Sequence, residues 1–228
     1  MYLGVKYAMD RKRLFSPARG LYVVVPPEYR SVGVVPATQF IDPMMNHLGI
    51  GYYLGLATAA GWWGSSHHAS QEFQVIVNGR LPDRTIGTMR LRFISRAWLD
   101  DKAIRRVAGP RTMLNVSTPD LTAVDLAANP ARVGGWSNIA TILPELPDLD
   151  GPHIGAIAKH RTRADARRLG WLLSLVRHDV NLCALMNLAD PNHGQPTLLA
   201  SNKPRTGQVD DDWNVLVNTI VEPVSGST

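Results

Sequence analysis

The sequence predicts an α+β fold, because helical and strand patterns both recur along a chain that is long and apolar enough to bury a core. The chain has 228 residues, of which 45% are hydrophobic and 19% are charged. This composition suits one large domain or two small ones and argues against disorder. The 16 prolines and 19 glycines follow no G-X-Y period, and no segment repeats, which excludes collagen, solenoid and propeller folds.

Residues 1–36 predict a small N-terminal module made of a helix end, a hairpin and a linker. A helix is expected from Val5 to Met9, and the strand Leu14-Phe15 is joined by turn residues to a β-branched strand over 21–25. Three prolines without an apolar period then mark a linker up to Pro36. A helix, a basic turn and a hairpin in this order are typical of the end of a winged helix, so a partial winged helix-turn-helix is expected here.

Residues 37–228 are expected to form a larger mixed α/β C-terminal domain that begins with a helix. Asp42 is the predicted cap of this helix, and Pro43 is its predicted first residue. Apolar residues then recur at helical intervals as far as Leu56. The pattern therefore predicts one continuous helix up to that residue.

Strands are expected in the middle and near the end of this domain. The first two, over 73–77 and 86–94, are rich in β-branched and aromatic residues, and the second alternates apolar residues with arginines. One face of that strand should be buried while the other carries the arginines. Two further strands are expected over 197–200 and 213–217.

Three helices are expected between these strands. Thr118 is a predicted N-cap followed by a first-position proline, and a second helical pattern starts at Asn138. The clearest helix begins after Thr162, which forms a predicted capping box with Asp165, and it continues to Val176.

The formal net charge of +5 favours polyanionic partners such as nucleic acids. Most of the basic residues are arginines, whose planar guanidinium suits phosphates and guanine edges. A GC-rich genome would produce the same excess of arginine without any functional meaning. Both explanations stay open at the level of the sequence.

Five cations gather near the start of the last predicted helix. They are Lys159, Arg161, Arg163, Arg167 and Arg168. Cations at a helix N-terminus oppose the helix dipole, so a bound phosphate would compensate their charge and accept hydrogen bonds. The alternative is a solvated basic face that Asp165 partly neutralises. We name these five residues as candidate DNA-binding residues.

A second group of candidate DNA-binding residues lies in the N-terminal module. Arg19 stands at the tip of the predicted hairpin, and Arg11, Lys12 and Arg13 precede it in the basic turn. In a winged helix, these positions meet DNA phosphates or the minor groove. An ordinary basic surface hairpin is the alternative, but the hairpin and its charges coincide in one small module, which favours DNA binding.

The sequence predicts no catalytic residue, no metal site and no cofactor. His67-His68 does not fit the spacing of a metalloprotease motif, and Gly64-Ser65 lacks the paired acids of a nucleotidyltransferase. Ser174 and His178 supply hydrolase residue types but no nucleophile elbow. The lone Cys183, together with the lack of an apolar span or a signal peptide, predicts a cytoplasmic protein with no membrane partner.

Three segments in a fixed order carry a resemblance to a known family. They are Arg19-Gly20-Leu21-Tyr22-Val23-Val24-Val25-Pro26, Tyr52-Tyr53-Leu54-Gly55-Leu56-Ala57-Thr58-Ala59-Ala60 and Thr118-Pro119-Asp120-Leu121-Thr122. In this order they resemble the AbiEi-type antitoxins of type IV toxin–antitoxin (abortive infection) systems. The resemblance is firmest between Leu14 and Leu146 and extends to the helix over 163–176 and to Trp213-Asn214-Val215.

The resemblance implies a non-enzymatic antitoxin that binds double-stranded DNA at its own promoter, represses its operon and counters a nucleotidyltransferase-type toxin. Direct contact with that toxin is left open. Members of the family begin with two or three helices before the wing, whereas only Leu3 to Met9 precedes it here, so a shortened N-terminus with little base reading is expected. The alternatives are a nucleic-acid-processing enzyme, or a protein-interaction module without DNA binding.

Overall fold

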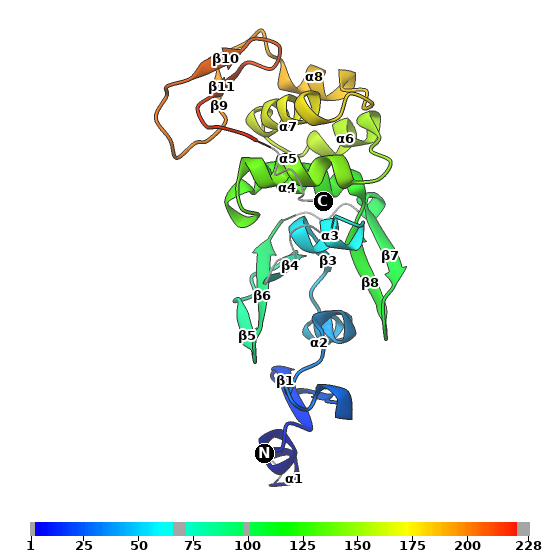
Figure 1. The fold of residues 1–228 in the computed structure, drawn as a ribbon. Coiled ribbons are helices and arrows are strands. Elements are labelled where there is room, and N and C mark those ends of the chain that lie inside the picture. Colours follow the sequence, from blue (N-terminus) through cyan, green and yellow to red (C-terminus); the bar gives the residue numbers. More distant parts are fainter. Residues whose placement is uncertain (1–2, 66–71, 98–100, 223–228) are drawn as a thin grey trace, which may run out of the picture. The chain divides into compact units, whose positions relative to one another are not determined.

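The structure is a computed structural model, and it describes residues 3–65, 72–97 and 101–222 (Figure 1). The chain divides into two compact units. The first consists of Met1–Thr58 and Ser70–Val116, and the second of Ala59–Ala69 and Ser117–Thr228. Helix α3 (Leu56–Trp62) begins in the first unit and ends in the second.

The first unit combines two helices, a two-stranded hairpin and a mixed sheet. Its elements before the sheet are α1 (Leu3–Asp10), β1 (Leu14–Ala18), β2 (Leu21–Val24) and α2 (Ile41–Leu48). The sheet strands are β3 (Tyr52–Leu54), β4 (Glu72–Val77), β5 (Arg84–Ile86), β6 (Met89–Ser95), β7 (Ile104–Ala108) and β8 (Met113–Ser117). Within the described residues they are ordered β5-β6-β4-β3-β8-β7. The central strand β3 pairs antiparallel with β4 and parallel with β8, and all of its residues are buried.

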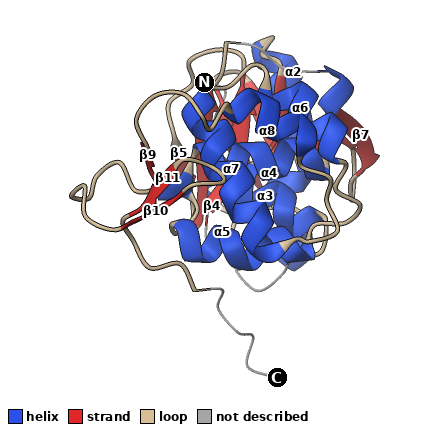
Figure 2. Ribbon diagram, turned by 90° about the horizontal axis from the view of Figure 1, so that it is seen from above, coloured by secondary structure: helices blue, strands red, loops and turns tan. Residues whose placement is uncertain are grey.

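The second unit is a group of helices with a small sheet. Its elements are α4 (Pro119–Ala128), α5 (Trp136–Ile142), α6 (Gly151–Ala158), α7 (Arg163–Val176), α8 (Cys183–Ala189), β9 (Thr197–Leu198), β10 (Gln208–Asp210) and β11 (Val215–Val217). Helix α4 contacts α5, α6 and α7, and these helices lie side by side in both ribbon views (Figures 1 and 2). Every residue from Pro119 to Ala127 is buried, so α4 forms the core of this unit.

The predicted α+β fold class is confirmed, and so are the two clearest helix starts. Thr118 caps α4, since its hydroxyl oxygen accepts a hydrogen bond from the Leu121 N–H at 3.2 Å. Thr162 and Asp165 form the expected capping box at the start of α7, with the Asp165 N–H donating to the Thr162 hydroxyl at 3.1 Å.

The prediction of one helix from Asp42 to Leu56 is wrong. Helix α2 ends before Gly49, which takes a left-handed conformation with φ of 65°, and Tyr52–Leu54 forms β3 instead. Both faces of β3 are buried, so its apolar residues match a helical pattern equally well. Asp42 is not the cap but lies inside α2, where it accepts hydrogen bonds from the Tyr52 hydroxyl at 2.9 Å and from Asn46 at 3.0 Å.

Several other predicted bounds change for local reasons. The strand expected over 86–94 starts later, as β6 at Met89, because Gly87 adopts φ of 60° and turns the chain between β5, which ends at Ile86, and β6. The last two strands are shorter than expected. Strands β7, β8 and β10 and helices α3, α6 and α8 were not predicted, since their short apolar runs are ambiguous on their own.

The N-terminal hairpin packs within the first unit beyond the expected linker. The rings of Phe15 and Phe40 meet edge to face, with centroids 5.2 Å apart. His47 on α2 hydrogen-bonds the Arg19 carbonyl oxygen at 2.9 Å, and the Arg84 guanidinium donates to the Pro17 carbonyl oxygen. The boundary expected at residue 36 therefore lies inside a packed unit. The winged-helix interpretation stays a prediction.

Two glycine substitutions in the second unit test how closely α7 packs. A Cβ at Gly170 would lie 2.0 Å from the ring of buried Trp213, whereas a Cβ at Gly61 would meet nothing within 4 Å. We expect Gly170→Ala to lower the free energy of unfolding by about 1–3 kcal/mol through overpacking. Gly61→Ala, the matched control on α3, should be neutral or stabilising by up to about 1 kcal/mol. Urea unfolding measures both, and unchanged stability of Gly170→Ala would contradict this packing.

Candidate nucleic-acid interface

Two arginines of the N-terminal segment present free guanidinium groups. Arg19 occupies the tip of the β1–β2 hairpin, where Gly20 with φ of 81° closes the turn. Arg13 lies at the base of the hairpin, where its carbonyl oxygen accepts a hydrogen bond from the Val25 N–H at 2.8 Å. Both side chains are exposed. Neither makes a hydrogen bond or an ion pair with any described residue, so both are available to phosphates.

The other two predicted cations of this segment are held by local contacts. Lys12 has φ of 53°, and its ammonium group donates to the Ser31 carbonyl oxygen at 3.0 Å. Its methylene carbons would lie 3.1–3.4 Å from a Cβ added at Gly33, so a larger residue there would have to displace the Lys12 side chain slightly. The Arg11 guanidinium lies 4.5 Å from the centroid of the Tyr7 ring, a cation–π contact at an exposed site. These contacts orient both charges without neutralising them.

The structure corrects the prediction for Arg167, which is only 3% exposed. Its guanidinium donates to the carbonyl oxygens of Ala189, Asp190, His193 and Gln195 at distances of 2.5–3.1 Å. Burial, followed by the neighbouring Arg163, lowers the pKa of Arg167 from its ordinary value. Because its donors serve the loop after α8, Arg167 holds this unit together and is closed to DNA.

Arg161 and Arg168 are also largely engaged inside the second unit. A terminal nitrogen of Arg161 lies 2.6 Å from a carboxylate oxygen of Asp125, which is fully buried. The Nε of Arg168 donates to the Leu198 carbonyl oxygen at 2.9 Å, and one of its terminal nitrogens lies 3.5 Å from Asp165. Arg161 therefore compensates a buried acid, which makes it a poor phosphate ligand.

Lys159 and Arg163 remain on the surface of the predicted cluster. Both are exposed, and Arg163 lies 3.2 Å from the carboxylate of Asp190. An exposed ion pair of this kind is weak and exchanges readily with other anions. The five-cation cluster predicted from the sequence is thus divided, with two residues facing solvent and three directed inward.

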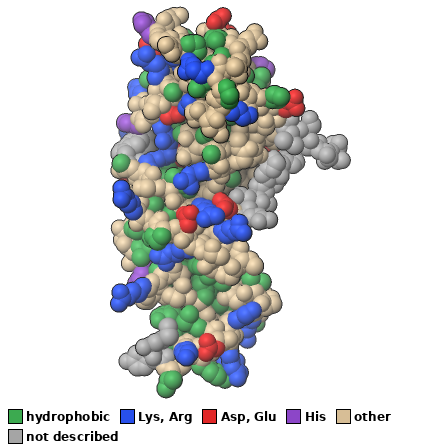
Figure 3. All heavy atoms as spheres, turned by 90° about the vertical axis from the view of Figure 1, so that its left-hand side faces the viewer, with side chains coloured by type: hydrophobic (Ala, Val, Ile, Leu, Met, Phe, Trp, Pro, Cys, Tyr) green, Lys and Arg blue, Asp and Glu red, His purple; other side chains and the backbone are tan. Residues whose placement is uncertain are grey.

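Further exposed arginines lie on the β7–β8 hairpin of the first unit, which sequence reasoning missed. They are Arg105 and Arg106 on β7 and Arg111 in the turn before β8. The Gly109-Pro110 dipeptide is a turn signal that would have located this hairpin. Arg92 on β6 is different, since it pairs with Glu72 at 2.7 Å and with Asp83 at 3.1 Å. Lys and Arg side chains clearly outnumber Asp and Glu on the face drawn in Figure 3.

The residue types of a hydrolase do not assemble on α7. The Ser174 hydroxyl donates to the Trp171 carbonyl oxygen at 2.9 Å rather than to a histidine. A histidine–carboxylate pair exists elsewhere, where His153 Nδ1 lies 2.6 Å from Asp120. Asp120 also accepts the Asp150 N–H at 2.9 Å, so this pair anchors the start of α6. It has no hydroxyl or thiol partner among the described residues.

The described residues contain neither a cluster of metal ligands nor a membrane-spanning helix. Among residues 3–65, 72–97 and 101–222, no three His, Cys, Asp or Glu side chains lie close enough to hold a metal ion. His67-His68 falls outside these ranges. No helix in the described part of the chain combines the length and the apolar character needed to cross a bilayer.

Comparisons with known proteins identify a family and a similar fold. A family model described as the AbiEi antitoxin C-terminal domain matches residues 53–175, more than half of the chain. The crystal structure of the RV2827C protein from Mycobacterium tuberculosis is similar, with a TM-score of 0.68 and 16% identity over 93% of this chain and 78% of that chain. At this identity the likeness concerns the fold alone. No curated protein matches.

Two substitutions on α7 separate buried from exposed arginines. Arg167→Gln should lower the free energy of unfolding by about 2–4 kcal/mol, because several buried carbonyl groups lose their donor. Arg163→Gln removes the same charge from an exposed ion pair and should cost less than about 1 kcal/mol. Chemical denaturation monitored by circular dichroism provides the measurement. Equal stability of the two variants would show that Arg167 is not a structural residue.

Proposed function

Because the chain belongs to the AbiEi antitoxin C-terminal domain family, we propose that it is the non-enzymatic antitoxin of a toxin–antitoxin pair and the DNA-binding repressor of its own operon. The toxin that it counters is of the nucleotidyltransferase type, and both act in the cytoplasm. The family match over residues 53–175 carries the antitoxin role. The proposal of DNA binding rests separately, on the exposed basic side chains.

The N-terminal segment supports DNA binding through the way it holds Arg13 and Arg19. The hairpin is fixed to α2 through His47 and the Phe15–Phe40 contact, so its tip is not a freely moving loop. A guanidinium presented from a fixed backbone loses less conformational entropy when it binds a phosphate. In this proposal the hairpin within residues 1–36 supplies the DNA contacts, and residues 37–228, on which the hairpin packs, carry the antitoxin function.

The second unit offers a smaller contribution to DNA binding. Lys159 and Arg163 are exposed there, while the other predicted cations of that cluster face inward. Contacts from isolated cations to phosphates add affinity without reading sequence. Binding to DNA should therefore depend strongly on salt and weakly on sequence.

The salt dependence of DNA binding tests the role of the hairpin. The double variant Arg13→Gln/Arg19→Gln should reduce the slope of log K against log salt by up to about 1.8, at about 0.9 per lost phosphate contact. Arg92→Gln is the matched control, because Glu72 and Asp83 already neutralise that charge. Fluorescence anisotropy with duplex promoter DNA measures the slopes. A slope that is unchanged in the double variant would remove the hairpin from the interface.

The same double variant should separate the two parts of the proposed function. Arg13 and Arg19 precede the matched residues 53–175, so their loss should leave toxin neutralisation intact while it relieves repression. Growth rescue on coexpression with the toxin from the same operon, alongside a promoter reporter, measures both effects. Loss of rescue by a folded double variant would show that the hairpin acts on the toxin rather than on DNA.

A further inference from the structure

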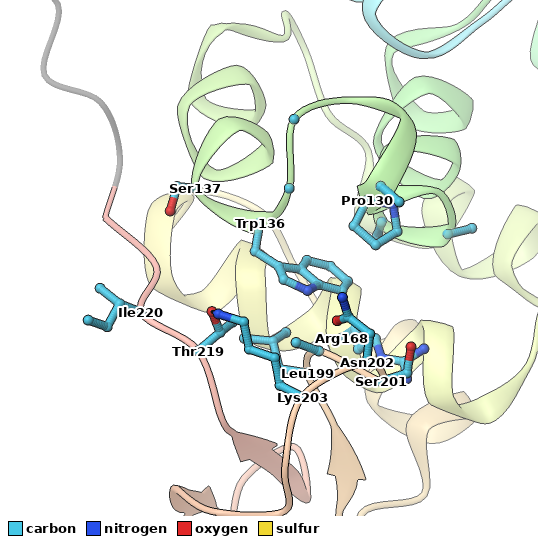
Figure 4. A pocket seen from close by; sticks show the side chains of 16 residues that line it. Pro130, Trp136, Ser137, Arg168, Leu199, Ser201, Asn202, Lys203, Thr219 and Ile220 are labelled. Atoms are coloured by element: carbon cyan, nitrogen blue, oxygen red, sulfur yellow. The ribbon is translucent and has the colours of Figure 1, made fainter.

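A pocket of about 550 Å³ lies in the second unit and is open to solvent along the exposed residues 201–203. Its walls come from the end of α4, the turn that leads into α5, Arg168 on α7, the loop after β9 and the segment after β11 (Figure 4). Five separate stretches of chain thus converge on one space. Its volume falls in the range of about 300–1,000 Å³ that is usual for small-molecule sites.

Two cations in the lining retain unused donors. Lys203 Nζ donates to the Thr219 hydroxyl at 2.7 Å, and an ammonium group has two further N–H donors. Arg168 donates through Nε to the Leu198 carbonyl oxygen, and one terminal nitrogen has no hydrogen-bond partner among the described residues. Burial lowers the pKa of Arg168, and Asp165 offsets only part of that effect. The site therefore holds positive charge that is incompletely compensated.

The remaining lining residues add donors and an apolar wall. Trp136 lies in the middle of the pocket above Lys203 and Arg168 (Figure 4), and its indole N–H makes no hydrogen bond to a described residue. Asn202 supplies an amide and Leu199 supplies apolar surface. Ile220 is at the rim, where it is 79% exposed and its side chain points away from Trp136 (Figure 4). No aspartate or glutamate is among the lining residues. A space rich in donors and lacking carboxylates favours an anionic ligand that accepts hydrogen bonds.

We propose that this pocket binds a nucleoside monophosphate, with its phosphate on Arg168 and Lys203 and its base against Trp136 and Leu199. The cavity is too large for an inorganic phosphate alone, and its apolar and aromatic wall calls for an organic part that is planar and weakly polar. The site lies outside the DNA-binding surface proposed above, and it adds a small-molecule ligand to the antitoxin domain.

Isothermal titration of the full chain tests this site. The ligands are AMP, GMP, CMP and UMP, the four nucleosides, ribose 5-phosphate and inorganic phosphate. At least one monophosphate should bind with one-to-one stoichiometry, and its nucleoside should bind at least about tenfold more weakly, because charge-assisted hydrogen bonds are lost. Lys203→Gln should weaken the monophosphate by about tenfold for the same reason.

Control variants distinguish a loss of ligand contacts from a loss of folding. Lys159→Gln removes an exposed charge of the same unit that does not line the pocket, and it should leave the affinity unchanged. Trp136→Phe keeps an aromatic ring but removes the N–H, so it should weaken binding less than Lys203→Gln does. Arg168→Gln is read only alongside circular dichroism, because Arg168 also holds the Leu198 carbonyl.

Three results would overturn the proposal. The first is no binding of any monophosphate at millimolar concentration. The second is equal affinity for inorganic phosphate, which would leave the organic part without contacts. The third is a Lys203→Gln variant that loses duplex DNA affinity yet binds monophosphates normally, which would make Lys203 part of the DNA surface. None of these measurements depends on toxin neutralisation, so the ligand site and the antitoxin role are tested separately.

Discussion

The burial of α4 is the constraint on which the second unit depends. This helix is enclosed from Pro119 to Ala127, yet it carries two aspartates. Buried carboxylates are costly unless they are paired and hydrogen-bonded. Asp125 is paired with Arg161 at 2.6 Å, and Asp120 is held by His153 at 2.6 Å. These pairs fix the start of α6 and the turn into α7, so the arrangement of the helices follows from satisfying the acids of α4.

The same requirement decides which basic residues can act on a ligand. Four carbonyl oxygens, one at the end of α8 and three in the loop after it, point toward Arg167, and its guanidinium donates its hydrogen bonds to them. The Arg161 guanidinium is paired with the buried carboxylate of Asp125. Arg168 is left beside a cavity, while Lys159 and Arg163 stay in solvent. A single basic stretch of sequence thus serves three purposes: structural support, a ligand pocket and surface charge.

In the first unit, packing turns a weakly specified hairpin into a defined surface. A two-stranded hairpin is marginal by itself, but the Phe15–Phe40 contact and the bonds from His47 and Arg84 hold it on α2 and β5. This support keeps Arg19 at the tip and Arg13 at the base. The proposed division of labour follows, with DNA contacts on the hairpin and the family domain bearing the antitoxin role.

The sequence alone determined the features that depend on neighbouring residues. The caps at Thr118 and Thr162 and the turn at Gly20 were readable because each signal spans a few positions. The α+β class and the AbiEi family were readable from patterns that recur along the chain. The tertiary structure decided the rest. Tyr52–Leu54 is a strand because it pairs with β4 and β8. Arg161 faces inward because its guanidinium pairs with Asp125, a residue 36 positions earlier in the sequence. Such partners are distant in sequence, so no local pattern contains them.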